Sequence, residues 1–579
     1  MHSIKCNDSQ KNRGGNRMNF KKIFSTAMAV TLAGSLLAAC SNNNNKGGSE
    51  ASSSPSASQA SQTPAETKTP AEIRFTLASE PPSLDPALMV DAQSSIVASG
   101  LFDGLTRLNS AGEPEPAIAK DWKASDDGLT YTFNLRDDAK WSNGDPVTAH
   151  DFEYSWKRAL AQETASDYAY MLFYLVNGEK YNSGEATADQ VGVKATGDYT
   201  LEVKLNTATP YFNSLVAHYT YWPVNKSAVD GKPEWAADAS TMVTNGPFLL
   251  KEWKHGDKLV LEKNPNFYDA AKVGFDMATI TLVEDASTVF SLFNTDKIDW
   301  IGAQAGEVPS DQVPGMVKEG KAEIKTIAST YYYLFNTKQK PFSNVKIRKA
   351  FSMAIERQSI IDNVTKANQT PAFALVPPSI AGSEGKSFRE MYPDQSFSSE
   401  NVEEAKKLLA EGLKEEGLDK FPETTLLYNT SEGHKAIAEA AIDMWRKNLG
   451  IELKLSNQEW GTFLETRKAG QFGIARAGWG ADFNHAINFT YDLIHSKSGN
   501  NDGKYNNPEV DKLLDGSFSA TDDASRLDMI SKAEKIALSD DMAVMPIYYY
   551  TTVTMQKPGF KDVVSDYAGH LDWAFGSKE

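Results

Sequence analysis

The chain has 579 residues, a formal net charge of −17 and 41% hydrophobic residues, enough for large cores. This charge argues against nucleic acid as a partner. It also argues against a basic surface on the protein that would bind a membrane. The part that can fold is long enough for roughly three domains of about 150 residues each.

The first segment of the chain has the pattern of a secretion signal. A pair of lysines precedes an apolar stretch over residues 23–39. Serine, threonine and glycine interrupt this stretch, so it is poor as a permanent membrane span. Residues 1–17 carry no apolar pattern. We therefore expect translation to begin at Met18 and residues up to 39 to form a signal peptide.

A lone cysteine, Cys40, ends the apolar stretch in the sequence Leu-Ala-Ala-Cys. This sequence resembles the bacterial lipobox, and the resemblance implies that Cys40 receives a diacylglycerol and becomes the mature N-terminus. Two or more acyl chains anchor a protein stably where one does not. An ordinary signal peptide followed by a free thiol is the alternative. The only other cysteine, Cys6, lies before the expected start of the mature chain. The mature chain can therefore form no internal disulfide.

The next segment, residues 40–72, has the composition of a tether. It contains almost only small and polar residues with a few charges, so it cannot bury a core and should be disordered. A flexible coil of about 30 residues spans roughly 30 Å. It would connect the anchor to the folded part.

Three segments in the first half of the folded part alternate apolar and polar residues in the manner of half-buried strands. They are residues 128–136, 199–206 and 257–264. The last long aromatic and β-branched segment, residues 543–557, also predicts a strand.

Two helices stand out in the second half of the chain. Asn401 can cap the first, with Glu404 in the capping-box position. The second runs from a Ser431 cap to Gly450, which can end a helix in the left-handed conformation. A strand over residues 451–457 follows it. Together these elements predict an α/β fold with mixed sheets.

Few motifs carry catalytic chemistry. HExxH, GxSxG, Walker and GxGxxG sequences do not occur. Ser343 and Lys346 match the S-x-x-K motif of penicillin-binding proteins, but no KTG follows, and a polar turn entering a helix near Val345 is the favoured interpretation. His485, Asp492 and His495 lack metal-ligand spacing and are predicted to be solvated polar residues.

One stretch, residues 473–489, combines three glycines with Arg, Trp and Asp among apolar residues. Gly478 and Gly480 flank Trp479 and permit the close approach of an extended backbone. Asp482 follows in a polar turn. An Asp in a dry cleft can bind an ammonium group, but composition alone favours a helix cap for this residue.

Four blocks of sequence resemble the oligopeptide-binding proteins of ABC importers, which are large extracytoplasmic solute-binding proteins. The resemblance spans about residues 73–557, and the second and fourth blocks are long and specific. The blocks are residues 83–105, 119–160, 243–269 and 426–550.

The resemblance implies a three-lobed periplasmic-binding-protein-like fold in which two main lobes close on a cleft by a hinge. The chain would cross between lobes I and III near residues 330 and 551. The implied boundaries are 73–102, 228–330 and 552–579 for lobe I, 103–227 for lobe II, and 331–551 for lobe III.

The resemblance also implies how a peptide is held. Asp482 matches the aspartate that pairs with the peptide α-ammonium group. The backbone of Val90, Asp91 and Ala92 would pair with the peptide as an added strand, and the segment Gly478-Trp479-Gly480 would pair from the other lobe.

Other site residues follow from the same resemblance. Tyr168 and Tyr550 match tyrosines of the cleft, and Trp460 matches a tryptophan of a pocket wall. Three further residues match groups that neutralise peptide carboxylates at different peptide lengths, namely Arg467, Arg476 and His434.

The sequence departs from close relatives at three places. His485 and Ala486 replace a Glu-Pro pair, Gly480 replaces a cysteine, and Val90 replaces a glutamate. These changes bear on pocket detail and on the preferred peptide length.

The expected function is a lipid-anchored, extracytoplasmic binding protein that delivers short peptides to the permease and ATPase subunits of an ABC importer. We expect a monomer with no catalysis, cofactor or metal. Alternatives are a family member specialised for dipeptides, murein peptides, pheromones or nickel chelates, and an acyl-transfer enzyme that uses Ser343 and Lys346.

Overall fold

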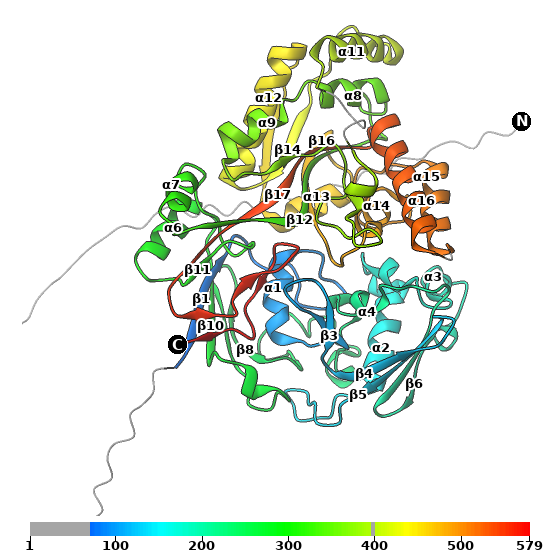
Figure 1. Cartoon of the computed structure of the whole chain (residues 1–579), viewed down its shortest axis with the longest axis vertical. Helices are drawn as coiled ribbons and strands as arrows, with labels where there is room; N and C mark the ends of the chain where they lie inside the picture. Colours follow the sequence, from blue (N-terminus) through cyan, green and yellow to red (C-terminus); the bar gives the residue numbers. More distant parts are fainter. Residues whose placement is uncertain (1–69, 395–399, 521) are drawn as a thin grey trace, which may run out of the picture. The chain divides into compact units, whose positions relative to one another are not determined.

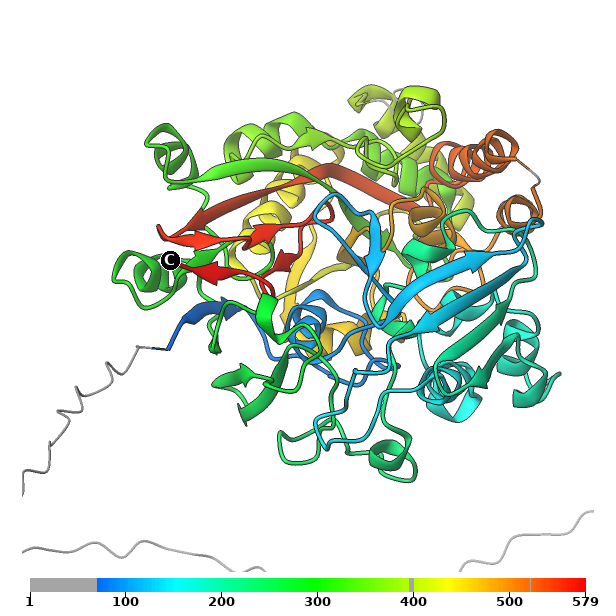
Figure 2. The same ribbon diagram turned by 60° about the horizontal axis from the view of Figure 1, so that its bottom comes forward.

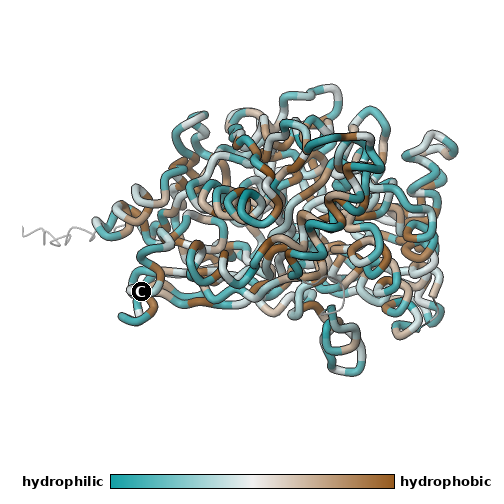
Figure 3. Tube along the Cα trace, turned by 90° about the horizontal axis from the view of Figure 1, so that it is seen from above, coloured by the Kyte–Doolittle hydropathy of each residue, from teal (hydrophilic) through white to brown (hydrophobic). Residues whose placement is uncertain are grey.

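The computed structural model describes residues 70–394, 400–520 and 522–579. These residues form three main sheets with helices packed around them (Figure 1), which confirms the predicted α/β class with mixed sheets. Hydrophilic segments dominate the outer helices and loops, whereas hydrophobic segments gather inside (Figure 3). The predicted signal peptide, Cys40 and the tether up to residue 69 lie outside the described residues.

The first sheet has the strand order β1-β10-β9-β8. Strand β1 pairs with β10 in parallel, and the remaining pairs are antiparallel. The strand predicted over residues 257–264 is confirmed as β9. The bounds are β1 Glu72–Leu77, β8 Phe248–Lys254, β9 Lys258–Lys263 and β10 Met277–Leu282.

The two ends of the described chain share the core beside this sheet. Trp573 is fully buried, and its ring lies 5.7 Å from that of Phe75 and 4.9 Å from that of Phe248. The indole Nε1–H donates to the carbonyl oxygen of Ile96 at 3.0 Å. Figure 2 shows β1 and the C-terminal strands close together. The C-terminal return is therefore part of the same packed unit as the N-terminal strand.

The second sheet is antiparallel in the order β4-β5-β7-β6. The strands predicted over residues 128–136 and 199–206 are confirmed as β5 and β7. Their alternating residues, such as Phe133 and Leu201, are fully buried. The bounds are β4 Ala119–Ala124, β5 Thr130–Leu135, β6 Val193–Gly197 and β7 Thr200–Lys204.

The third sheet has the order β11-β17-β12-β16-β14-β15, with the short β13 paired to β17. The aromatic segment predicted as a strand is confirmed as β17. The strand predicted from residue 451 begins at Lys454, because Ile451 and Leu453 pack into the core before the ladder starts. The bounds are β11 Trp300–Ile301, β12 Glu323–Phe335, β13 Thr370–Pro371, β14 Thr425–Asn429, β15 Lys454–Gln458, β16 Ile474–Gly480 and β17 Val544–Gln556.

The ladder between β12 and β17 is interrupted at the place where the sequence predicts a hinge. Pairing runs from Glu323 to Thr326 and resumes at Thr330 after a shift in register. Between these points, the Ala328 N–H donates to Tyr567 instead of β17, and its carbonyl accepts from Ala481. This shift lies near the crossing predicted at residue 330, and the two crossings near residues 330 and 551 stay a prediction.

The predicted helix caps are mostly correct. Ser431 Oγ accepts from the His434 N–H, and Gly450 ends the helix with φ of 69°. Asn401 also caps its helix as predicted. The capping box is wrong, however, because the Glu404 carboxylate pairs with Lys407 instead of returning to the cap residue.

The longer helices cover the sheets, with α8, α11 and α12 grouped beside the third sheet (Figure 1). Their bounds are α1 Ala92–Leu101, α2 Ala149–Leu160, α6 Ala286–Asn294, α7 Val313–Lys318, α8 Val345–Met353, α11 Val402–Glu416, α12 Glu432–Leu449, α13 Trp460–Lys468, α14 Ile487–Ile494, α15 Pro508–Phe518 and α16 Asp523–Lys535. Short helices are α3 Gly178–Asn182, α4 Phe212–Leu215, α5 Lys226–Val229, α9 Arg357–Ile360 and α10 Phe388–Met391.

Replacing Trp573 should destabilise the protein because its ring fills the core shared by the two ends. We expect Trp573→Ala to lower the free energy of unfolding by about 3–5 kcal/mol, measured by urea denaturation. Leu88→Ala, at an exposed apolar side chain, is the control and should change it by less than about 0.5 kcal/mol. Equal small effects of both substitutions would show that the C-terminal return is not part of the core.

Candidate functional site

The edge of β16 that faces away from β12 is unpaired over its second half. Strand β14 pairs with β16 only at Ile474 and Ala475. The Trp479 carbonyl accepts from Ser329 Oγ, and the Ala481 N–H donates to the Ala328 carbonyl, so both groups point toward β12. Because backbone polar groups alternate along a strand, those of Gly478 and Gly480 point to the free edge.

A second unpaired backbone segment precedes α1. The backbone N–H and C=O of Val90 make no hydrogen bond within the described residues. Asp91 caps α1, since its carboxylate accepts from the backbone N–H groups of Gln93 and Ser94. Burial raises the pKa of Asp91, and hydrogen bonds from Ser94 and Gln93 oppose this shift. The predicted contact segment 90–92 is therefore fixed by the helix that it starts.

Asp482 lies at the end of β16 and is held by Asn488 of α14. The Asp482 N–H donates to Asn488 Oδ1 at 2.8 Å, and Asn488 Nδ2 donates to Asp482 Oδ2 at 2.9 Å. The alternative role as a helix cap is wrong, because the carboxylate accepts from this side chain rather than from the first backbone N–H groups of α14. Asn488 also donates to Asp492, whose pKa is raised well above its usual value by burial and by the charge of Asp482. Asn488 therefore links the two carboxyl groups.

The other oxygen of Asp482 faces His218. Nε2 of His218 lies 3.4 Å from Asp482 Oδ1. Its Nδ1 accepts a hydrogen bond from the Thr220 N–H, so Nε2 is the ring nitrogen that faces the carboxylate. Within the described residues no lysine or arginine contacts Asp482. The described residues therefore give this carboxylate a histidine neighbour but no lysine or arginine.

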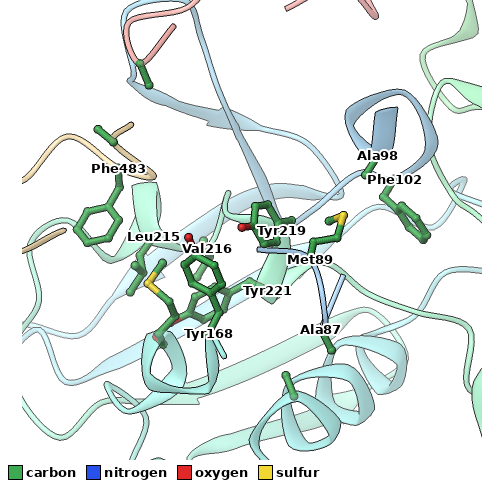
Figure 4. Packing of buried hydrophobic residues seen from close by; sticks show 14 of the residues in the cluster. Ala87, Met89, Ala98, Phe102, Tyr168, Leu215, Val216, Tyr219, Tyr221 and Phe483 are labelled. Atoms are coloured by element: carbon green, nitrogen blue, oxygen red, sulfur yellow. The ribbon is translucent and has the colours of Figure 1, made fainter. Parts of the chain in front are cut away.

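Aromatic rings surround this carboxylate. Tyr168 is buried, and its ring lies 4.9 Å from His218, 5.6 Å from Tyr219 and 6.3 Å from Trp479. Figure 4 shows Tyr168 and Tyr219 with Phe483, which follows Asp482 in the chain. Tyr168 precedes α3 and Trp479 belongs to β16, so these two segments meet at this point.

Arg476 and Tyr550 lie near the other end of the free edge. Arg476 donates to the Tyr550 hydroxyl at 2.8 Å and to Asn429 Oδ1 at 3.2 Å. A Cβ on Gly478 would lie 3.1 Å from that hydroxyl and 3.2 Å from the guanidinium group. The glycine therefore lets both side chains approach the strand.

The two other predicted carboxylate partners differ in state from Arg476. Arg467 forms an ion pair with Asp502 at 2.6 Å, so its charge is already balanced. His434 lies on the first turn of α12, 5.7 Å from the Tyr331 ring. Burial and the charge of Arg476 lower the pKa of His434 well below its usual value. His434 is therefore neutral near pH 7.

Trp460 starts α13 and has two environments. Its indole lies against the carboxylate of Asp91. It also lines a cavity of about 550 Å³ that is bordered by residues 79–85, Trp253 and Glu459. Trp460, which is predicted to form a pocket wall, thus lies between α13 and the segment before α1.

Three residues were considered as metal ligands and predicted to be solvated. The prediction of solvation is wrong for two of them. Asp492 and His495 are buried, because α14 turns them inward. His485 stacks on Tyr211 with the ring centres 4.3 Å apart. No group of three residues in the described ranges could hold a metal ion.

Polar contacts join the segments predicted as lobes II and III. Lys468 pairs with Asp167 at 2.7 Å, and Lys497 pairs with Glu179 at 2.5 Å. Asn500 donates to the Tyr170 hydroxyl at 3.2 Å. Together with the rings around Asp482, these contacts join the two segments.

Sequence reasoning missed several of these residues. His218 and Tyr219 come from a segment with no recognisable motif, so no signal could have found them. Asn488 and Asp492 do carry a signal, since they lie one helical turn apart and just after Asp482.

A family model described as bacterial extracellular solute-binding proteins, family 5, matches residues 113–501. The chain belongs to this family. It is 42% identical to the "Oligopeptide-binding protein OppA" of Bacillus subtilis over 503 residues, covering 86% of this chain and 91% of that protein. The predicted family and periplasmic-binding-protein-like fold are thereby confirmed.

Two solved structures of the family match this chain more closely than a third one that is described as an open form. Haemophilus influenzae OppA in complex with RPPGFSPFR has a TM-score of 0.83 and 33% identity, covering 88% of this chain and 99% of that one. The murein tripeptide binding protein MppA of Escherichia coli is also 33% identical. Its TM-score is 0.81, and the match covers 88% of this chain and 98% of that one. The unliganded open form of MppA has a TM-score of only 0.59, although the match covers 88% of this chain and 97% of that one. The arrangement of the sheets in this family 5 protein is therefore closer to the first two structures.

His485 should stay neutral through the mildly acidic range. Burial, with a contribution from the charge of Arg526, lowers its pKa to about 3, whereas an unfolded histidine titrates near 6.5. Between these values the unfolded state binds the extra proton, so acidification through this window costs stability. NMR of the ring protons, assigned with His485→Gln, should show no titration of His485 from pH 8 down to 4. A midpoint near 6.5 would contradict its packing against Tyr211.

Proposed function

We propose that this family 5 protein captures short peptides outside the cytoplasmic membrane and delivers them to an ABC importer. The observation that carries the proposal is the free edge of β16, which ends at a buried carboxylate. A peptide strand added to this edge gains main-chain hydrogen bonds that do not depend on side-chain identity. The printed names of the relatives, which include oligopeptide-binding proteins, support the same ligand class.

Asp482 would bind the α-ammonium group of the peptide. Asn488 holds the carboxylate in place, and no lysine or arginine among the described residues contacts it. A charge-assisted bond shielded from water is strong. The ammonium group would thus fix one end of every ligand.

The carboxyl end of the peptide would then point toward Arg476. From Arg476 to Gly480 the strand measures about 14 Å, the length of an extended peptide of about four residues. Arg476 has no carboxylate partner within the described residues, whereas Arg467 is already paired with Asp502. We therefore assign Arg476 as the first carboxylate partner and expect Arg467 to act only if its ion pair opens.

A binding role without catalysis fits the Ser343 region better than acyl transfer. Ser343 lies in the turn before α8, which is capped by Asn344. Lys346 pairs with Glu411 at 2.8 Å and Glu415 at 2.6 Å, and these bonds raise its pKa. A lysine held in its charged form is a poor general base.

The anchor is a further part of the proposal. Among the described residues no helix is long and apolar enough to cross a membrane. Lipid on Cys40 would hold the protein at the outer face of the membrane, as a monomer on the tether over residues 40–72. There it could contact the permease directly.

Removing the carboxylate of Asp482 should weaken peptide binding strongly. Asp482→Ala would leave a buried ammonium group unpaired, a loss of roughly 3–5 kcal/mol. This corresponds to at least about 100-fold in Kd, measured by calorimetry with a tetrapeptide. An N-acetylated tetrapeptide should bind the wild type weakly too, because it lacks the charge.

The two changes should not add, because both remove the same contact. A fourth calorimetric titration, of the acetylated peptide with Asp482→Ala, tests this. Equal binding of free and acetylated peptides to the wild type would show that Asp482 does not bind the ammonium group.

Replacing Cys40 tests the anchor. Cys40→Ala should leave the protein unprocessed or release it from the membrane, because the acyl acceptor is gone. Membrane fractionation and the mass of the mature chain report this. A variant that fractionates and matures like the wild type would contradict lipid attachment at Cys40.

A further inference from the structure

Glu307 lies beside the site but outside every role described so far. It follows β11 in a loop that is fixed to β17, since the Ala303 N–H donates to Thr552 Oγ1 at 3.1 Å and Gly302 bridges to Ala305. The loop brings the Glu307 carboxylate to the start of α12. A Cβ on Gly433 would lie 3.5 Å from Oε2 of Glu307.

The carboxylate of Glu307 has no hydrogen bond or ion pair with another described residue, and the residue is exposed. Burial raises its pKa, and the charge of Arg476 opposes the shift. The charge of Glu307 contributes to raising the pKa values of Tyr548 and Tyr550, which are next to Arg476. At the same time Glu307 keeps accessible surface. The acceptor is therefore available to a molecule that enters from the site.

Arg476 gives independent evidence that a ligand completes this cluster. Its side chain is only 9% exposed, and its Nε has no hydrogen-bond partner among the described residues. The hydroxyl of Tyr331, whose ring lies 5.1 Å from the guanidinium group, is also buried without a partner. Unused donors and an unused acceptor thus lie together, which suits a ligand that carries both a negative and a positive group.

We propose that Glu307 is a specificity-determining residue that accepts the basic side chain of the third or fourth residue of a bound peptide, while Arg476 accepts its carboxylate. This inference rests on the proposed function. The peptide would run antiparallel to β16, with its ammonium group at Asp482. Its last residues would then lie between Arg476 and Glu307. In a peptide without a basic residue, Glu307 would compete with the peptide carboxylate for Arg476.

Calorimetry with matched tetrapeptides tests the inference. The peptides are tetra-alanine and its variants with lysine or norleucine at position three or four, because norleucine keeps the length of the lysine stem without the charge. We expect the wild type to bind the better lysine peptide at least about tenfold more tightly than its norleucine match. Glu307→Gln should reduce this ratio below about twofold and leave binding of tetra-alanine equal or tighter.

Asp311→Asn is the matched control, since it removes an exposed carboxylate from the same segment. It should keep the wild-type ratio. No lysine preference in the wild type, or a preference that survives Glu307→Gln, would overturn the role of Glu307 while leaving peptide binding intact. Failure of the wild type to bind any of these peptides would instead overturn the proposed function and this inference with it.

Discussion

The site depends on the carboxylate of Asp482, to which the described residues supply no lysine or arginine. Asn488 donates to this carboxylate and also to Asp492, whose pKa is raised well above its usual value by burial and by the charge of Asp482. A carboxylate charge that is shielded from water and has no cation carries a free-energy cost. Binding of an ammonium group would remove it. The rings of Tyr168 and Trp479 exclude water from the same place, which strengthens that interaction.

The sheet supplies the second constraint. Strand β16 is central in the third sheet, yet β14 leaves it after Ala475 and so opens an edge inside the protein. The break in the ladder between β12 and β17 lies close to this edge, so bending at the predicted hinge would expose or cover it.

Much of this could be predicted from the sequence, and the reasons differ by element. Strands β5, β7 and β9 follow from alternation, and α12 follows from its caps, because these signals are local. The family resemblance pointed to Asp482, whereas composition alone favoured a helix cap. The partners His218 and Glu307 could not be predicted, since each is brought to the site by tertiary contacts from distant segments. The prediction that His495 is solvated was wrong, because polarity alone does not show which way α14 faces.

The central claim is that this protein binds peptides by their backbone and ends. Native mass spectrometry tests it most directly, on protein that has been unfolded, freed of ligand, refolded and exposed to a mixture of random short peptides. The account predicts bound peptides of narrow length, diverse side chains and free N-termini, with basic residues enriched near the carboxyl end. Refolded protein that binds no peptide, or that binds N-blocked peptides equally well, would contradict it.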